Sequence, residues 1–185
     1  MVSARPRYAY VAHCLLNANS KVGDGALCAG VYSPLVDRLR ADGWTLRQLP
    51  CPELAFTGLH RFWAVRQQYD TRAYRAHCER LARAVAGAME ADLRDGGDAM
   101  VVGIDGSPSM GVRLTASDGS WGGRPAVPEA DQYPVVPGAG LFTEALLAEL
   151  ARRGVVARAV GFAQDVPGHD EAAELRRVDE ELARG

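Results

Sequence analysis

The stretch AMVVGID at residues 99–105 decides the fold of this chain. It is a short apolar run that ends in Asp105 and is followed at once by the turn-forming sequence GSPSMG at residues 106–111. A short apolar run bounded by glycine, proline and serine is typical of a strand that is buried on both faces, as in the centre of a parallel sheet. We therefore expect residues 99–105 to be the central strand.

Similar short strand-like runs occur elsewhere, at residues 8–13, 45–50 and 155–161. Segments with apolar residues at helical spacing lie between or after them, at residues 33–43, 70–94, 142–153 and 170–184. Strands separated by helices pair in parallel through right-handed crossovers. The sequence thus predicts one doubly wound, Rossmann-like α/β domain over residues 1–185, with a mainly parallel sheet of about four strands.

The segment from residue 106 to residue 138 is rich in glycine, proline and serine and has few periodic apolar residues. A loop of this length inside a compact domain is usually functional. We expect it to be a long active-site loop. Trp121 within it is a candidate to stack on a heteroaromatic ring of a substrate, although it could equally anchor the loop.

Composition excludes several classes of protein. Hydrophobic residues make up 48% and charged residues 24% of the chain, and the formal net charge is -2, so disorder and bulk electrostatic binding of nucleic acid are not expected. No apolar run is long enough to span a bilayer, and no signal peptide is recognisable. We expect a cytoplasmic protein whose partner is a small molecule, not a membrane or a nucleic acid; the sequence does not indicate its oligomeric state.

Two of the four cysteines follow predicted strands directly. Cys14 follows the first strand and Cys51 follows the second, in Cys-Pro-Glu. The carboxyl ends of parallel strands lie on one edge of a sheet, where ligands bind in such folds. In a reducing compartment, this placement favours metal ligation or thiol chemistry over disulfides, although burial alone is the usual fate of one cysteine.

The other candidate residues lie in the same loops. Glu53 could move a proton or remain a solvated carboxylate. Asp105 could contact substrate or cap the turn that follows it. Ser107 and Ser109 could bind an anion or satisfy their own backbone.

The two remaining cysteines are weaker candidates. Cys78 lies on the apolar stripe of the long helix and is predicted to be a core residue. Cys28 is expected to pack against the first helix, with a role as a third ligand left open. No zinc motif, nucleophile elbow or phosphate-binding loop is present.

Three segments together carry a resemblance to a known family: HCLLN at residues 13–17, CPE at residues 51–53 and DGSPS at residues 105–109. NSKV at residues 19–22, QYDT at residues 68–71 and WGG at residues 121–123 extend it. The chain resembles the short desulfidases related to 2-thiouracil desulfurase, formerly a domain of unknown function, in their single-domain branch.

The resemblance implies removal of sulfur from a thiocarbonyl compound, such as a thiolated pyrimidine, with release of hydrosulfide. It implies a [4Fe-4S] cluster held by three cysteines, with one iron open to the sulfur of the substrate. Cys14 and Cys51 match two ligands, Glu53 matches the acid or base, and Ser107 matches a serine that holds the substrate.

Met110 occupies the place of the third ligand. A neutral thioether is a poorer ligand for cluster iron than a thiolate. Three hypotheses follow: a desulfidase whose cluster uses Cys28 or weaker ligation, a relative without a cluster that binds a small molecule, and an enzyme that uses Cys14 or Cys51 as nucleophile with Glu53 or His13 as base.

Overall fold

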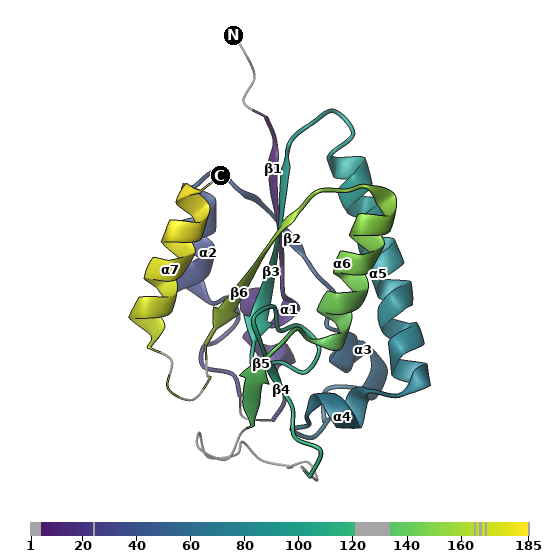
Figure 1. Ribbon diagram of the computed structural model, residues 1–185. Coiled ribbons are helices and arrows are strands. Elements are labelled where there is room, and N and C mark those ends of the chain that lie inside the picture. The colour runs from purple at the N-terminus through teal and green to yellow at the C-terminus, as the bar shows by residue number, and fades with distance from the viewer. Residues whose placement is uncertain are drawn as a thin grey trace.

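The computed structural model describes residues 5–23, 25–120, 134–164, 166, 168 and 170–184. Its main sheet contains four parallel strands in the order β2-β1-β3-β6 (Figure 1). The strands are β1 (Arg7–Val11), β2 (Thr45–Gln48), β3 (Asp98–Asp105) and β6 (Arg158–Ala163). The predicted α/β fold with a parallel sheet is confirmed, and β3 is a central strand of that sheet, buried from Ala99 to Asp105.

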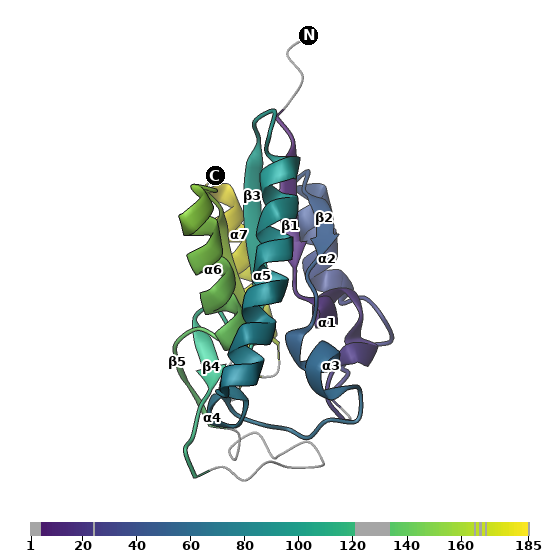
Figure 2. The same ribbon diagram turned by 90° about the vertical axis from the view of Figure 1, so that its right-hand side faces the viewer.

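Helices cover both faces of the sheet (Figures 1 and 2). One face carries α2 (Ser33–Ala41) and α7 (Glu171–Ala183), and the other carries α5 (Arg72–Asp92) and α6 (Leu141–Arg153). From β1 the chain crosses to β2, and then returns past β1 to form β3. The winding direction therefore reverses between β1 and β3, and ligands bind at the carboxyl ends of strands near such a reversal.

The long helix α5 shows why these residues fold as they do. The hydroxyl of Thr71 caps its first turn by accepting a hydrogen bond of 3.2 Å from the backbone N–H of Tyr74. Residues at helical spacing form its buried face, which packs on the sheet and on α6: Tyr74, Cys78, Ala82, Ala86 and Met89. Cys78 is thus a core residue, as its spacing predicts.

Several short elements were not predicted from the sequence. They are α1 (His13–Leu16), the 3-10 turn η1 (Ala18–Ser20), α3 (Pro52–Thr57), α4 (Arg66–Tyr69), β4 (Leu114–Ala116) and β5 (Val135–Pro137). The strands β4 and β5 pair antiparallel within the segment predicted as a loop over residues 106–138. The described part of that segment therefore contains a second, two-stranded sheet.

All four predicted strands have different bounds in the structure: the second ends at Gln48 and not at residue 50, and the third begins one residue earlier, at Asp98. The first ends at Val11, because the chain turns into α1 at His13. The fourth begins at Arg158, not at Val155, and Val156 is 87% exposed. Among the described residues, no helix is long and apolar enough to cross a membrane.

Candidate functional site

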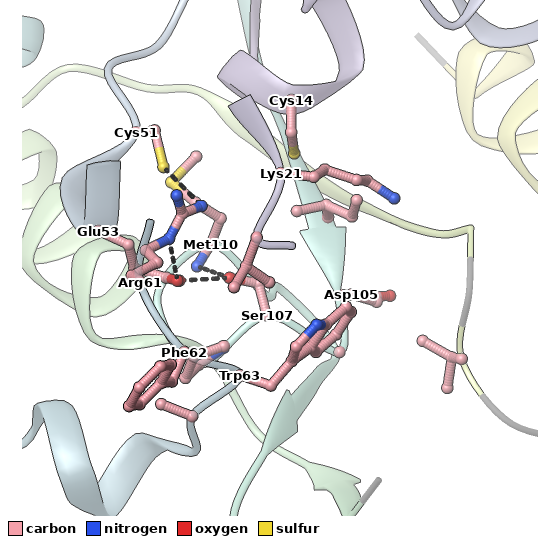
Figure 3. A pocket seen from close by; sticks show the side chains of 16 residues that line it. Cys14, Lys21, Cys51, Glu53, Arg61, Phe62, Trp63, Asp105, Ser107 and Met110 are labelled. Atoms are coloured by element: carbon pink, nitrogen blue, oxygen red, sulfur yellow. Dashed lines mark hydrogen bonds and ion pairs between the residues drawn. The ribbon is translucent and has the colours of Figure 1, made fainter. Parts of the chain in front are cut away.

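A pocket lies at the carboxyl edge of the main sheet, and its walls come from the segments that follow β1, β2 and β3 (Figure 3). The predicted candidates Cys14, Cys51, Glu53, Asp105 and Ser107 all line it, as does Met110. Lys21, from the NSKV segment, also lines it, and the structure adds four residues that the sequence did not single out: Arg61, Phe62, Trp63 and Val166. Most of the candidates chosen from strand ends therefore converge on one cavity.

The two thiols reach the pocket from short helices. Cys14 is the second residue of α1, and Cys51 is the residue that caps α3. The sulfur of Cys51 accepts a hydrogen bond of 3.4 Å from the backbone N–H of Leu54, and Pro52 at the first helical position has no N–H to satisfy. Figure 3 shows the thiol of Cys51 beside Arg61 and the thiol of Cys14 beside Lys21, both on the side of the pocket away from Phe62 and Trp63.

Burial and, to a smaller extent, the nearby charge of Glu53 together raise the pKa of the Cys51 thiol to about 11. Hydrogen bonding from the Leu54 amide and the charge of Arg61 oppose this rise only in part. The thiol is therefore protonated at neutral pH in the protein alone. Burial, with the charge of Arg61, also lowers the pKa of His13, so its imidazole is neutral there.

Glu53 is held from two sides. Ser107 Oγ donates a hydrogen bond of 3.3 Å to Glu53 Oε1, and Arg61 Nε lies 3.4 Å from Glu53 Oε2. The side chains of Arg61 and Glu53 are only 6% and 12% exposed. A partly buried ion pair with added hydrogen bonds fixes the carboxylate in one orientation, facing the cavity.

The hydroxyl of Ser107 has a fixed direction. Its oxygen accepts hydrogen bonds from the backbone N–H groups of Ser109 and Met110, at 3.2 and 3.0 Å. Because a serine hydroxyl has one hydrogen and two lone pairs, the hydrogen is left for Glu53. The turn after β3 thus aims one hydroxyl at one carboxylate.

Arg61 also ties the pocket wall together. Its guanidinium donates to the carbonyl oxygen of Ser20 at 2.9 Å and to that of Gly58 at 3.4 Å, and its Nη2 lies 4.0 Å from the sulfur of Cys51. No spacing pattern in the sequence points to this residue, because it lies in the irregular segment between α3 and α4. The one sequence feature that places Arg61 near the site is its position eight residues after Glu53.

Asp105 lines the pocket, but its carboxylate is occupied. Oδ1 accepts hydrogen bonds from the backbone N–H groups of Val112 and Arg113, both at 2.9 Å, and Oδ2 contacts Arg113 Nε at 2.7 Å. Arg113 in turn pairs with Glu174 of α7 at 2.7 Å. These contacts match the structural alternative for Asp105, which is to hold the turn that carries Ser107.

Of three other candidates, two do not line the pocket and one lies outside the described residues. Ser109 is fully buried, and its hydroxyl lies 2.7 Å from the hydroxyl of Tyr74. The thiol of Cys28 lies 3.5 Å from the carbonyl oxygen of Val31 and does not line the cavity. Trp121 lies outside the described residues. Trp63, with Phe62, instead supplies an aromatic wall opposite the two thiols (Figure 3).

The donor set does not fit an iron–sulfur cluster held by three cysteines. Cys14 and Cys51 are the cysteines that line the cavity, and the third sulfur there is the neutral thioether of Met110. Over the described ranges, no group of three or more histidine, cysteine, aspartate or glutamate side chains is arranged to hold a metal ion.

Fold and site define an α/β protein with a thiol-lined pocket at the winding reversal of its sheet. No family model matches the chain. The uncharacterized protein MJ0003 of Methanocaldococcus jannaschii is 30% identical over 106 residues, which are 57% of this chain and 68% of that protein. The chain belongs to the family of MJ0003.

One solved structure also has a similar fold. It is described as a [4Fe-4S]-dependent thiouracil desulfidase, TudS, and is 23% identical, with a TM-score of 0.49. The alignment covers 96% of this chain and 99% of that one.

Proposed function

We propose that this protein removes sulfur from a small heteroaromatic thiocarbonyl compound by hydrolysis in the pocket. The observation that carries the proposal is the hydrogen bond from Ser107 to Glu53 inside a cavity that also holds two thiols and an aromatic wall. The two thiols, Glu53 and Ser107 come from the three segments that resemble the short desulfidases, and this resemblance supports the proposal. Arg61, Phe62 and Trp63 are independent of that resemblance.

The aromatic wall favours a flat substrate. Phe62 is 64% exposed and Trp63 is 9% exposed, so one ring lies at the mouth of the cavity and the other forms its inner surface. A heteroaromatic ring packed against them gains burial and stacking energy. Its sulfur then points to the opposite end, where the thiols and Met110 provide a soft, polarizable surface.

The reaction replaces sulfur by oxygen at one carbon and needs no oxidant or reductant. Glu53 accepts a proton from water, and the oxygen of that water bonds to the thiocarbonyl carbon. The carbon–sulfur bond then breaks as the second proton of that water moves to the sulfur, which leaves as hydrosulfide; the oxo compound remains, and Glu53 holds the first proton. Ser107 and Arg61 hold the carboxylate in the orientation that this proton transfer requires.

No step of this reaction is assigned to an iron–sulfur cluster, because the donor set falls one thiolate short. The alternative with Cys51 as nucleophile is disfavoured by the raised pKa of its thiol, since the thiolate is the attacking species.

An activity assay with 2-thiouracil as the test compound tests the proposal. The full chain, purified without oxygen, is assayed for uracil by chromatography and for sulfide by a colorimetric method. We expect equal amounts of the two products, and loss of both in Glu53→Gln. Arg152→Ala, on the exposed face of α6, is the matched control and should keep full activity. No sulfide from a panel of thiocarbonyl heterocycles would refute the proposal.

A further inference from the structure

Arg113 bridges two buried carboxylates that belong to different layers of the fold. Its Nε lies 2.7 Å from Asp105 Oδ2, and its Nη2 lies 2.7 Å from Glu174 Oε2. The side chains of Asp105 and Glu174 are 0% and 8% exposed, whereas that of Arg113 is 35% exposed. Asp105 ends β3 and Glu174 lies in the first turn of α7, so the arginine joins an outer helix to the sheet edge that carries the pocket.

The Asp105 end of this bridge closes the turn that carries Ser107. Asp105 Oδ1 accepts hydrogen bonds from the backbone N–H groups of Val112 and Arg113, both at 2.9 Å. Within the closed segment, the carbonyl oxygen of Ser107 accepts a hydrogen bond of 3.1 Å from the Thr115 hydroxyl. The position of the Ser107 backbone therefore depends on where the Asp105 carboxylate is held.

The Glu174 end is anchored on the sheet as well as on α7, which packs beside β6 (Figure 1). Glu174 Oε2 accepts a hydrogen bond of 3.2 Å from the backbone N–H of Ala163 in β6 and one of 3.0 Å from Arg177 Nη2. Arg177 also donates to the carbonyl oxygen of Gly161. A Cβ at Gly161 would overlap with both carboxylate oxygens of Asp105, so glycine leaves the space that this carboxylate occupies.

We propose that Arg113 and Glu174 are positioning residues for the Ser107 hydroxyl and, through it, for Glu53. Neither residue lines the pocket. They act through the Asp105 carboxylate, which sets the turn after β3 and hence the direction in which the hydroxyl points. The inference rests on the proposed function, and it adds to that function a part of the molecule, helix α7, that lies outside the pocket.

The bridge matters because two negative charges share one cation. Without the guanidinium of Arg113, both carboxylates stay buried, and a buried charge that loses its partner is strongly destabilised until water or a rearrangement replaces that partner. Glu174 keeps Arg177 and the N–H of Ala163. The remaining donors to Asp105 in the described part of the chain are backbone N–H groups of the turn itself. The rearrangement is therefore expected in the turn.

Kinetics of thiocarbonyl hydrolysis in two backgrounds test this role. In the parent chain, Arg113→Gln should lower kcat by about tenfold with little change in KM, because the misplaced hydroxyl no longer orients Glu53. In the Ser107→Ala background the same substitution should leave kcat unchanged, since the hydroxyl through which Arg113 acts is already absent. An equal loss of kcat in both backgrounds would overturn the proposal.

Further variants separate positioning from a general loss of charge or stability. Arg113→Lys keeps the charge but cannot contact two carboxylates with one planar fork, and should recover only part of the rate. Glu174→Gln should lower kcat in the same direction as Arg113→Gln. Arg176→Gln, on the exposed face of α7, is the matched control and should keep the kcat of the parent. Urea denaturation confirms that each variant is folded under the assay conditions, and parent kcat in both Arg113→Gln and Glu174→Gln would refute the role.

Hydrogen exchange of the full chain without substrate gives a readout that does not depend on activity. Mass spectrometry of peptides that cover residues 105–114 should show faster exchange in Arg113→Gln than in the parent, and no change in Arg176→Gln. Unchanged exchange in Arg113→Gln would overturn the inference whether or not the parent is active. Faster exchange supports it, and a parent chain that then releases no sulfide would refute the proposed function alone.

Discussion

Ser107 donates a hydrogen bond of 3.3 Å to Glu53, and this bond joins the turn after β3 to the first turn of α3. The two residues are 54 positions apart in the chain, and the parallel sheet brings their segments together at one edge. Because two backbone N–H groups donate to the Ser107 oxygen, the hydroxyl hydrogen has one direction, toward the carboxylate.

Removal of either partner tests this pair. Glu53→Gln should lower kcat for thiocarbonyl hydrolysis by about a hundredfold or more, since it removes the proton acceptor. Ser107→Ala should lower kcat by a smaller factor, because the carboxylate is still held by Arg61. Steady-state kinetics measure both; a double variant as active as Glu53→Gln alone would agree with one shared function, and full activity in Glu53→Gln would contradict it.

Arg61 is a positioning residue for the same carboxylate. In Arg61→Gln the ion pair with Glu53 and the contact with Cys51 are lost, and we expect kcat to fall by about tenfold to a hundredfold with little change in KM. Arg61→Lys restores charge but not the contacts to Ser20 and Gly58, and should recover only part of the rate. An effect on KM alone would indicate instead that Arg61 binds substrate directly.

Much of the fold could be predicted from the sequence because the decisive elements are buried. The run at residues 99–105 is apolar throughout, since β3 is a central strand, and the helical spacing from Tyr74 to Met89 reflects the packing of α5 on the sheet. The short helix α3 and the pair β4–β5 give too few residues for a periodic signal. Their positions depend on tertiary contacts that no local pattern encodes.

The site was predictable to the extent that topology fixes it. Cys14, Cys51 and Ser107 follow strands, so their convergence follows from parallel pairing. Arg61 lies in an irregular segment, where neither spacing nor a strand end points to it. For Ser109 the sequence could not distinguish a pocket residue from a buried one, since its neighbour Tyr74 is 35 positions away.

The buried pair of hydroxyls on Tyr74 and Ser109 should contribute to stability and not to binding. Tyr74→Phe leaves the Ser109 hydroxyl without its partner and should lower the free energy of unfolding by about 1 kcal/mol. The double variant Tyr74→Phe/Ser109→Ala should lose less free energy of unfolding than the two single variants lose in sum. Urea denaturation measures all three losses. Strict additivity would show that the two hydroxyls do not interact.

Asp92 should stabilise the fold in a pH-dependent way. Hydrogen bonding from Arg47 lowers its pKa, as does that from the Tyr10 hydroxyl, and burial opposes this in part. The contribution of Asp92 to the free energy of unfolding is complete above the pKa of an unfolded aspartate, about 3.9. It is lost as the pH falls through the lower pKa of Asp92 in the folded state.

Asp92→Asn should therefore lower the free energy of unfolding by about 1 kcal/mol at neutral pH, after allowance for solvent screening of Arg47. The difference in free energy of unfolding between the variant and the parent should shrink as the pH falls below the pKa of the unfolded aspartate. Denaturation curves at neutral and acidic pH measure this, and a difference that grows on acidification would contradict the assigned sign.

Turnover in water enriched in heavy oxygen tests the central claim most directly. If the pocket hydrolyses a thiocarbonyl group, mass spectrometry of the uracil formed from 2-thiouracil will show one heavy oxygen at the carbon that carried sulfur, with one sulfide released per uracil. Uracil without the label, or sulfide release that Glu53→Gln does not reduce, would contradict the account.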